Sequence, residues 1–184
     1  MTKGARRAVF LDRDGVLIHT DVRGGKPYAV TAPADVKIID GVQWACRALA
    51  EMGFLLVMTT NQPDVARGKV SQAFIDETNA MLAKTLALDA VQVCPHDDRD
   101  DCVCRKPKPG LMTEAAASLG IALEQSVVVG DRWRDVAAGK AAGCLTVFID
   151  YGYDEALRSP PDFVCQTLGE VVGWIRTAFL QENA

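Results

Sequence analysis

The chain has 184 residues, 49% hydrophobic and 24% charged, which suffices for one compact domain to bury a core. Its 24 acidic and 20 basic residues give a net charge of −4 without a basic run, which argues against nucleic-acid binding. No apolar stretch reaches the roughly 20 residues of a membrane span, and no signal-peptide pattern follows the basic N-terminus, so we expect a cytoplasmic protein.

Short apolar runs alternate along the chain with longer segments of helical period, a pattern typical of an α/β fold. The runs are continuously apolar, as strands of a mainly parallel sheet with helices on both faces should be. The expected strands are Ala8–Leu11, Phe54–Thr59, Ala90–Val93, Ser126–Val129 and Leu145–Ile149, with a short edge strand near Phe163–Val164. The expected helices are Val42–Met52, Ser71–Leu86, Gly110–Leu119, Trp133–Ala142 and one that begins at the capping box Thr167 to Glu170. The apolar face of the second helix comprises Phe74, Ile75, Thr78, Met81, Leu82 and Leu86.

Two connections, residues 19–39 and 94–109, are longer than tight turns. Both leave from the carboxyl edge of the sheet, where ligands of open parallel sheets bind, so we expect them to wall the site. Neither is long enough to form a cap domain, and we expect a single domain over residues 1–184 that acts as a monomer.

The first predicted strand runs directly into Asp12 and Asp14, two carboxylates in the sequence Asp-Arg-Asp-Gly. Paired buried carboxylates resist ionisation unless a cation lies between them, which favours a divalent metal or an acid–base pair. Taken alone, the pattern fits turns and calcium loops equally well.

Polar residues also follow two other predicted strands. Thr60, Asn61 and Gln62 offer donors for phosphate oxygens, although they could equally start a loop and cap a helix. Asp131 follows the fourth strand and Asp135 opens the next helix, where an N-cap is the simpler reading of one acid. Their convergence at one sheet edge favours a site for a hard cation such as Mg²⁺.

With these motifs in order, the chain resembles the haloacid dehalogenase (HAD) superfamily of phosphohydrolases, which have a three-layer Rossmann-like fold. The resemblance implies that Asp12 is the nucleophile that forms an aspartyl-phosphate, and that Asp14 is the general acid and base. It also implies that Thr60 and Lys106 neutralise the transferring oxygens. Asp12, the Asp14 carbonyl and Asp131 would hold Mg²⁺, with Asp135 in support.

The segment from Cys94 to Cys104 contains a Cys-x-His arm and a Cys-x-Cys arm, a ligand set for tetrahedral zinc. Because Cys94, His96, Cys102 and Cys104 would fill all four positions, we expect a structural zinc that fixes the loop 94–109 and the adjacent cations over the site. Surface cysteines without metal are the alternative. The remaining cysteines, Cys46, Cys144 and Cys165, are expected to be buried apolar groups.

The Arg105-Lys106-Pro sequence after this loop is similar to two families, the heptose-1,7-bisphosphate phosphatases and the histidinol-phosphate phosphatases. The Ala66-Arg67-Gly68 segment favours the heptose enzymes, whereas the short stretch between His96 and Cys102 favours the histidinol-phosphate enzymes. The resemblance implies removal of the 7-phosphate of D-glycero-D-manno-heptose 1,7-bisphosphate, and we expect Asn61, Gln62 and Arg105 to bind this substrate, with Arg105 holding the second phosphate. The alternatives are a histidinol-phosphate phosphatase, a phosphatase of another small sugar phosphate, and a catalytically silent zinc-stabilised binding domain. His19 is expected to face solvent.

Overall fold

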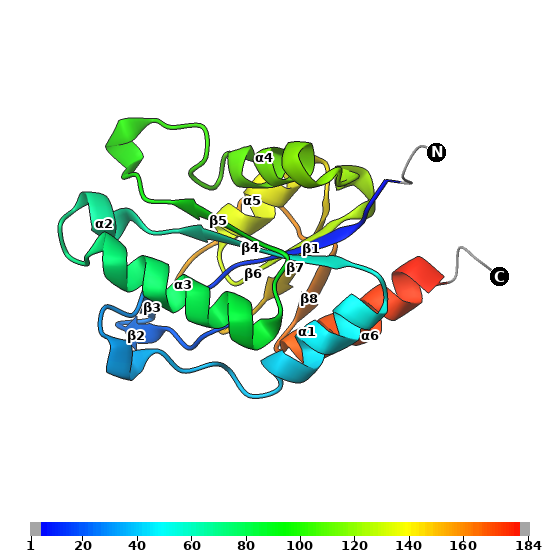
Figure 1. Cartoon of the computed structure of the whole chain (residues 1–184), viewed down its shortest axis with the longest axis horizontal. Helices are drawn as coiled ribbons and strands as arrows, with labels where there is room; N and C mark the ends of the chain where they lie inside the picture. The colour runs from blue at the N-terminus through cyan, green and yellow to red at the C-terminus, as the bar shows by residue number, and fades with distance from the viewer. Residues whose placement is uncertain (1–4, 181–184) are drawn as a thin grey trace.

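Six parallel strands form the central sheet of the structure, a computed structural model that describes residues 5–180 (Figure 1). Their spatial order is β5-β4-β1-β6-β7-β8, and each neighbouring pair is parallel. The strands are β1 (Ala8–Leu11), β4 (Leu55–Asn61), β5 (Ala90–Cys94), β6 (Val127–Gly130), β7 (Leu145–Ile149) and β8 (Phe163–Cys165). The predicted α/β architecture is confirmed, including the edge strand near Phe163.

Helices cover both faces of this sheet. Consecutive residues of each strand point to opposite sides, and because both sets are apolar, both faces must be buried. In β1, Val9 and Leu11 pack into one core cluster while Ala8 and Phe10 pack into the other. The first cluster lies beneath α1 (Val42–Glu51), α3 (Gln72–Leu86) and α6 (Leu168–Leu180). The second lies beneath α4 (Gly110–Leu119) and α5 (Trp133–Ala142), on the opposite side of the sheet in Figure 1. The chain thus forms three layers.

Helix α3 differs from its predicted apolar face at two positions. Met81 was expected to be buried but is 39% exposed, whereas Asn79 is only 5% exposed. The hydrophobic periodicity could not show that the core beneath α3 contains a buried arginine, whose guanidinium is the partner of Asn79. The start of α6 is as predicted, since Thr167 Oγ1 accepts a hydrogen bond from the Glu170 amide.

Several connections contain short elements that were not predicted from the sequence. A hairpin, β2 (Asp21–Arg23) and β3 (Lys26–Tyr28), and a 3₁₀ turn (Pro33–Asp35) lie between β1 and α1. A single turn, α2 (Pro63–Ala66), follows β4, and further 3₁₀ turns cover Asp98–Asp100 and Leu123–Gln125. The described part of the β1–α1 connection therefore holds no cap domain. Within residues 5–180, no helix is long and apolar enough to cross a bilayer.

Strand β4 runs two residues beyond its predicted end at Thr59. Thr60 and Asn61 pair with Val93 and Cys94 of β5, so both residues belong to the sheet rather than to a loop. Their side chains are thereby placed by a strand, which fixes direction better than a loop does.

Candidate active site

Three carboxylates meet at the carboxyl edge of the sheet, where β1 and β6 end side by side. Asp12 follows β1 and its amide donates to the Val129 carbonyl (3.0 Å), while Asp131 follows β6 and Asp135 lies in the first turn of α5. One carboxylate oxygen from each of the three acids lies within 4.8 Å of the others. The structure therefore brings Asp12 next to two acids that lie 119 and 123 positions further along the sequence.

Gly15 allows this close approach. Its φ of +85° is in the left-handed region that favours glycine, and a Cβ added there would lie 1.9 Å from Asp131 Oδ2. Any side chain at this position would push Asp131 out of the acidic cluster. The glycine after Asp14 is thus required both by the turn and by the packing of the third acid.

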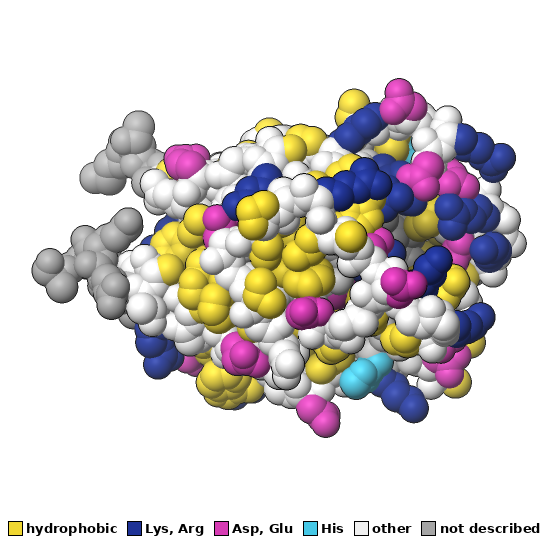
Figure 2. Space-filling model, turned by 180° about the vertical axis from the view of Figure 1, so that it is seen from behind, with side chains coloured by type: hydrophobic (Ala, Val, Ile, Leu, Met, Phe, Trp, Pro, Cys, Tyr) yellow, Lys and Arg dark blue, Asp and Glu magenta, His cyan; other side chains and the backbone are white. Residues whose placement is uncertain are grey.

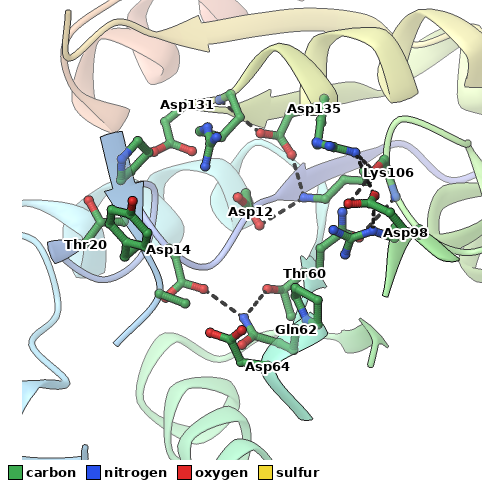
Figure 3. Close-up of a pocket in the computed structure, with 18 of the residues that line it drawn as sticks. Asp12, Asp14, Thr20, Thr60, Gln62, Asp64, Asp98, Lys106, Asp131 and Asp135 are labelled. Carbon is green, nitrogen blue, oxygen red and sulfur yellow. Dashed lines mark hydrogen bonds and ion pairs between the residues drawn. The ribbon is translucent and has the colours of Figure 1, made fainter. Parts of the chain in front are cut away.

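Lys106 supplies a buried positive charge to the cluster. The side chain is 3% exposed, and its Nζ lies 2.9 Å from Asp12 Oδ1 and 2.5 Å from Asp135 Oδ1. Nζ also donates to the Thr59 carbonyl (2.9 Å). Burial opposes the charged form, but Asp12 and Asp135 outweigh it and raise the pKa of the Lys106 ammonium. Lys106 is therefore a fixed cation against the Asp12 carboxylate, as Figure 3 shows.

The remaining negative charge is not fully compensated. Burial raises the pKa of Asp12 to about 7, with Lys106 opposing the shift and Asp135 and Asp14 adding to it. Burial, followed by the charges of Asp12 and Asp135, raises the pKa of Asp131 well above its usual range. Within the described chain, both carboxylate oxygens of Asp131 are buried without a hydrogen-bond partner.

A divalent cation fits this arrangement, because orphaned buried oxygens are rare unless an ion or water satisfies them. Asp12 and Asp131 have oxygens free for it. Asp135 is more fully engaged, since its Oδ1 accepts from Lys106 and its Oδ2 from the Arg132 amide (3.1 Å). The fit favours Asp12 and Asp131 as direct ligands and Asp135 as the residue that supports them.

Asp14, Gln62 and Thr60 form a second hydrogen-bonded group on the other side of Asp12 (Figure 3). Gln62 Nε2 lies 2.8 Å from Asp14 Oδ2 and 2.8 Å from Thr60 Oγ1. Asn61 holds the backbone of Lys106 at two points, donating to its carbonyl and accepting from its amide, both at 3.0 Å. Asn61 and Gln62 were predicted to bind substrate, and both line the cavity. In the structure their side-chain amides hydrogen-bond to Lys106 and Asp14, respectively.

These groups line a cavity of about 320 Å³. One wall carries Thr20, Pro27, Tyr28 and Ala29 from the connection after β1, and the other carries Arg67, Arg105 and Arg134. Both long connections therefore wall the site, as predicted. Figure 2 shows Lys and Arg side chains gathered with Asp and Glu at the right-hand end of the molecule.

Each arginine of this wall has an acidic partner. Arg67 contacts Asp97 through Nε and Nη2 (both 2.8 Å), whereas Asp98 Oδ1 accepts from Arg105 Nε (2.8 Å) and Arg134 Nη1 (3.3 Å). The Arg105 side chain is only 11% exposed, but that of Asp98 is 54% exposed. An anionic group of a ligand can therefore take the place of Asp98 as the partner of Arg105 while the Arg105 side chain stays buried.

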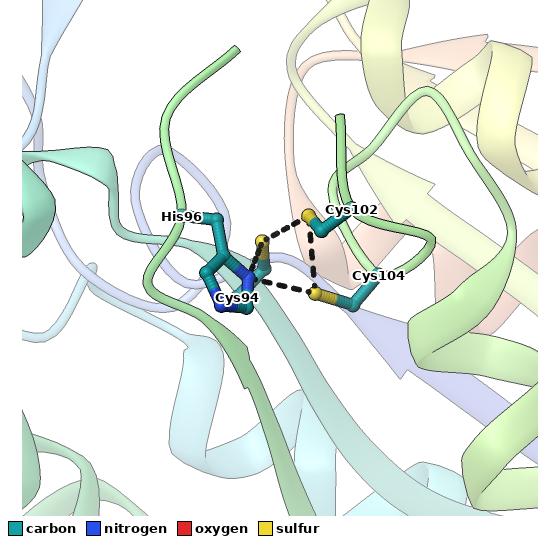
Figure 4. A group of neighbouring side chains, drawn as sticks. All are labelled: Cys94, His96, Cys102 and Cys104. Atoms are coloured by element: carbon teal, nitrogen blue, oxygen red, sulfur yellow. Dashed lines mark hydrogen bonds between the residues drawn. The ribbon is translucent and has the colours of Figure 1, made fainter. Parts of the chain in front are cut away.

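The four predicted zinc ligands form one cluster (Figure 4). His96 Nδ1 lies 3.7 Å from Cys94 Sγ and 3.3 Å from Cys104 Sγ, and Cys102 Sγ lies 3.6 and 3.4 Å from the other two sulfurs. A tetrahedron with Zn–S bonds of about 2.3 Å has edges of roughly 3.8 Å, close to these separations. The cluster can thus hold a zinc ion with only small adjustments.

Several residues in or beside the site were not predicted from the sequence. Among them are Asp98 and Arg134, which line the cavity, and Arg13 and Asn79, which are buried next to it. Asp98 and Arg134 lie in a charge-rich loop and a helix start, where solvated charges are the ordinary expectation. Arg13 stands between the two predicted catalytic acids, and that position was the signal available for it. His19 is exposed and Cys46, Cys144 and Cys165 are buried, as predicted.

Comparison with known proteins adds three findings. The family model described as HAD-hydrolase-like matches residues 103–171. The D-glycero-beta-D-manno-heptose-1,7-bisphosphate 7-phosphatase of Vibrio cholerae is 41% identical over 154 residues, which cover 77% of this chain and 80% of that protein. The protein of the same name from Escherichia coli K12 is 37% identical over 151 residues, 76% of each chain.

Among solved structures, the D,D-heptose 1,7-bisphosphate phosphatase from B. bronchiseptica, complexed with magnesium and phosphate, superposes with a TM-score of 0.79. The two chains are 28% identical, and the alignment covers 96% of this chain and 99% of the other. The match therefore extends over nearly the whole of both chains.

Proposed function

The chain belongs to the HAD-like hydrolases, in the family that includes the heptose-1,7-bisphosphate phosphatases, and we propose that it removes the 7-phosphate of D-glycero-D-manno-heptose 1,7-bisphosphate. The observation that carries the chemistry is the Asp12 carboxylate, 2.9 Å from the buried Lys106 ammonium and next to the orphaned oxygens of Asp131. An anion so placed is a nucleophile that faces a cationic site for a phosphoryl group.

In the proposed reaction, an Asp12 oxygen attacks phosphorus while the bond from phosphorus to the sugar oxygen breaks. Asp14 gives its proton to the leaving oxygen, so the sugar departs as an alcohol and Asp12 carries the phosphoryl group. Asp14, now a carboxylate, takes a proton from a water molecule that attacks the phosphorus. The bond from phosphorus to Asp12 then breaks, which releases inorganic phosphate and restores both acids.

The remaining site residues stabilise the charge of the phosphoryl group. Lys106 and the Thr60 hydroxyl face the transferring oxygens, and Asn61 keeps Lys106 in place. Asp12, the Asp14 carbonyl and Asp131 would hold Mg²⁺, which neutralises developing negative charge during phosphoryl transfer. The zinc held by Cys94, His96, Cys102 and Cys104 has a structural role.

A second phosphate on the substrate accounts for the cationic wall. Arg105 and Arg134 both donate to Asp98, and Arg67 lies on the same side of the cavity. A distal phosphate of a bisphosphorylated sugar can accept bidentate hydrogen bonds from such arginines. The facing wall, with Thr20 and Tyr28, is uncharged and suits the sugar.

The test is phosphate release with Mg²⁺ from heptose 1,7-bisphosphate and from histidinol phosphate, compared by kcat/KM. We expect at least a hundredfold preference for the bisphosphate, about 2.7 kcal/mol of transition-state binding. The opposite preference would assign the protein to histidinol phosphate. In Asp12→Asn, which is nearly isosteric, turnover of both substrates should disappear while the fold and the zinc content are retained. Residual turnover would refute the assigned nucleophile.

We further propose that the chain forms a single catalytic domain that works as a cytoplasmic monomer. Its support is that one chain already brings every predicted catalytic and magnesium-binding side chain to the same cavity. Light scattering after gel filtration, at micromolar concentration with Mg²⁺, should give the mass of one 19.8 kDa chain. A mass twice as large would contradict it.

A further inference from the structure

Arg13, the residue between the two predicted catalytic acids, is fully buried and is among the largest side chains in the core. Its Nε donates to Asp14 Oδ2 (3.0 Å) and its Nη2 donates to Asp14 Oδ1 (3.2 Å). This is a bidentate fork, which fixes the plane of a carboxylate as well as its distance. A buried arginine is seldom kept unless its charge is paired in this way.

The other end of the guanidinium reaches helix α3. Nη1 donates to Asn79 Oδ1 (3.3 Å), and Asn79 is itself 5% exposed. The main chain of Arg13 is fixed too, because its carbonyl accepts hydrogen bonds from the Leu17 and Ile18 amides (2.9 and 3.0 Å). Arg13 therefore forms a rigid link between the core beneath α3 and Asp14.

Gln62 completes the support of Asp14. Its Nε2 donates to Asp14 Oδ2 (2.8 Å), so the carboxylate accepts three side-chain hydrogen bonds from Arg13 and Gln62 together. The Asp14 side chain nevertheless remains 14% exposed and lines the cavity. The direction left open is that of the cavity, where the leaving oxygen of a phosphate ester would lie.

We propose that Arg13 is a positioning residue that holds the Asp14 carboxyl group in the orientation from which it protonates the leaving oxygen, and that Asn79 sets the orientation of Arg13. This inference rests on the proposed function, in which Asp14 is the general acid. Proton transfer needs the acid within hydrogen-bond reach of the leaving oxygen, and small misplacements lower the rate steeply. A role limited to stabilising the fold would not distinguish among leaving groups.

The discriminating measurement compares substrates whose leaving groups differ in their need for a proton. The alcohol of heptose 1,7-bisphosphate departs as a strong base and requires protonation, whereas p-nitrophenolate departs as a stabilised anion. The ratio of kcat/KM values isolates phosphoryl transfer to Asp12, since hydrolysis of the aspartyl-phosphate follows that step and is common to both substrates.

Two variants weaken the link to different degrees. Arg13→Lys keeps the charge but replaces the fork by a single point charge, and Asn79→Leu removes only the acceptor for Nη1. We expect Arg13→Lys to lower kcat/KM for the bisphosphate about a hundredfold and for p-nitrophenyl phosphate less than about fivefold. Asn79→Leu should change the ratio in the same direction, by about fivefold.

Ile75→Val is the packing control. Ile75 is fully buried on α3, one turn before Asn79, and its apolar side chain takes no part in the hydrogen bonds that hold Asp14. This substitution should lower the melting temperature and leave the substrate ratio at the wild-type value. Equal losses on both substrates in Arg13→Lys and Asn79→Leu, or no loss on either, would overturn the positioning role. Failure of the wild-type protein to release phosphate from either substrate would instead refute the proposed function.

Discussion

The acidic cluster makes the stability of the protein depend on pH in a direction that Mg²⁺ should remove. Burial raises the pKa of Asp12 to about 7, from an ordinary value of 3.8 in the unfolded chain. The folded state therefore binds more protons than the unfolded state between these values, and the free energy of unfolding falls as pH rises through this range. Asp131, whose pKa is also raised by burial, acts in the same direction.

The magnitude follows from the Asp12 shift. With the folded pKa at about 7, Asp12 lowers the free energy of unfolding by roughly 3 kcal/mol at pH 6 and roughly 4 kcal/mol at pH 8. The metal-free protein should thus be on the order of 1 kcal/mol less stable at pH 8 than at pH 6 from this residue alone. Bound Mg²⁺ stabilises the carboxylates as anions, so the difference should vanish when it is present.

The assay is urea denaturation at pH 6 and pH 8, with Mg²⁺ omitted or at millimolar concentration. A chelator is not used, because it would also remove zinc. Asp12→Asn is the control, since it lacks this titrating group and should lose the share of the difference that Asp12 contributes, while the share of Asp131 remains. A metal-free free energy of unfolding that is flat or rises from pH 6 to pH 8 would refute the reasoning. An equally steep fall in Asp12→Asn would refute the assignment of the effect to Asp12.

Two further predictions concern the loop 94–109. Cys102→Ser should bind zinc more weakly and lose roughly a quarter of the ~10–16 kcal/mol of a structural zinc site, about 3 kcal/mol or roughly 6–12 °C in Tm, with reduced activity. Full zinc occupancy and unchanged melting, or the same zinc loss in the control Cys144→Ser, would contradict a structural zinc. Asp98→Asn removes the carboxylate that Arg105 and Arg134 share, so KM for a bisphosphate should fall by up to about fivefold with kcat unchanged. An equal change for a monophosphate would show that Asp98 does not compete with a second phosphate.

Much of the fold could be predicted because strands buried on both faces are continuously apolar. The end of β4 was missed since Thr60 and Asn61 are polar, and only their pairing with β5 keeps them in the sheet. The hairpin after β1 left a signal in Gly24-Gly25, which form a two-residue loop with φ of +54° and +75°. Such loops need positive φ at both positions, and the flanking residues are too polar for periodicity to identify the strands.

The acids of the site could be predicted because each follows an apolar run, and the ends of parallel strands meet at one edge. Arg13 could not be, since it is buried beneath α3, where its partner Asn79 is 66 positions away in the sequence. A charged residue beside two acids is most simply read as their solvated neighbour. Only the packing of α3 over this edge shows that the guanidinium has no access to water.

The loop 94–109 explains why a phosphatase site would need zinc that takes no part in the chemistry. The loop has little core of its own, since Val103 is 77% exposed and the Asp101 side chain 90% exposed. Lys106 lies only two residues after Cys104 in this loop. Its ammonium group is nevertheless almost fully buried, between the carboxylates of Asp12 and Asp135. Desolvating that ammonium is costly unless its partners are held at hydrogen-bond distance. A zinc held by the four predicted ligands would fix one side of the lysine, and Asn61 fixes its backbone. The metal would thus substitute for the hydrophobic contacts that otherwise anchor such a residue.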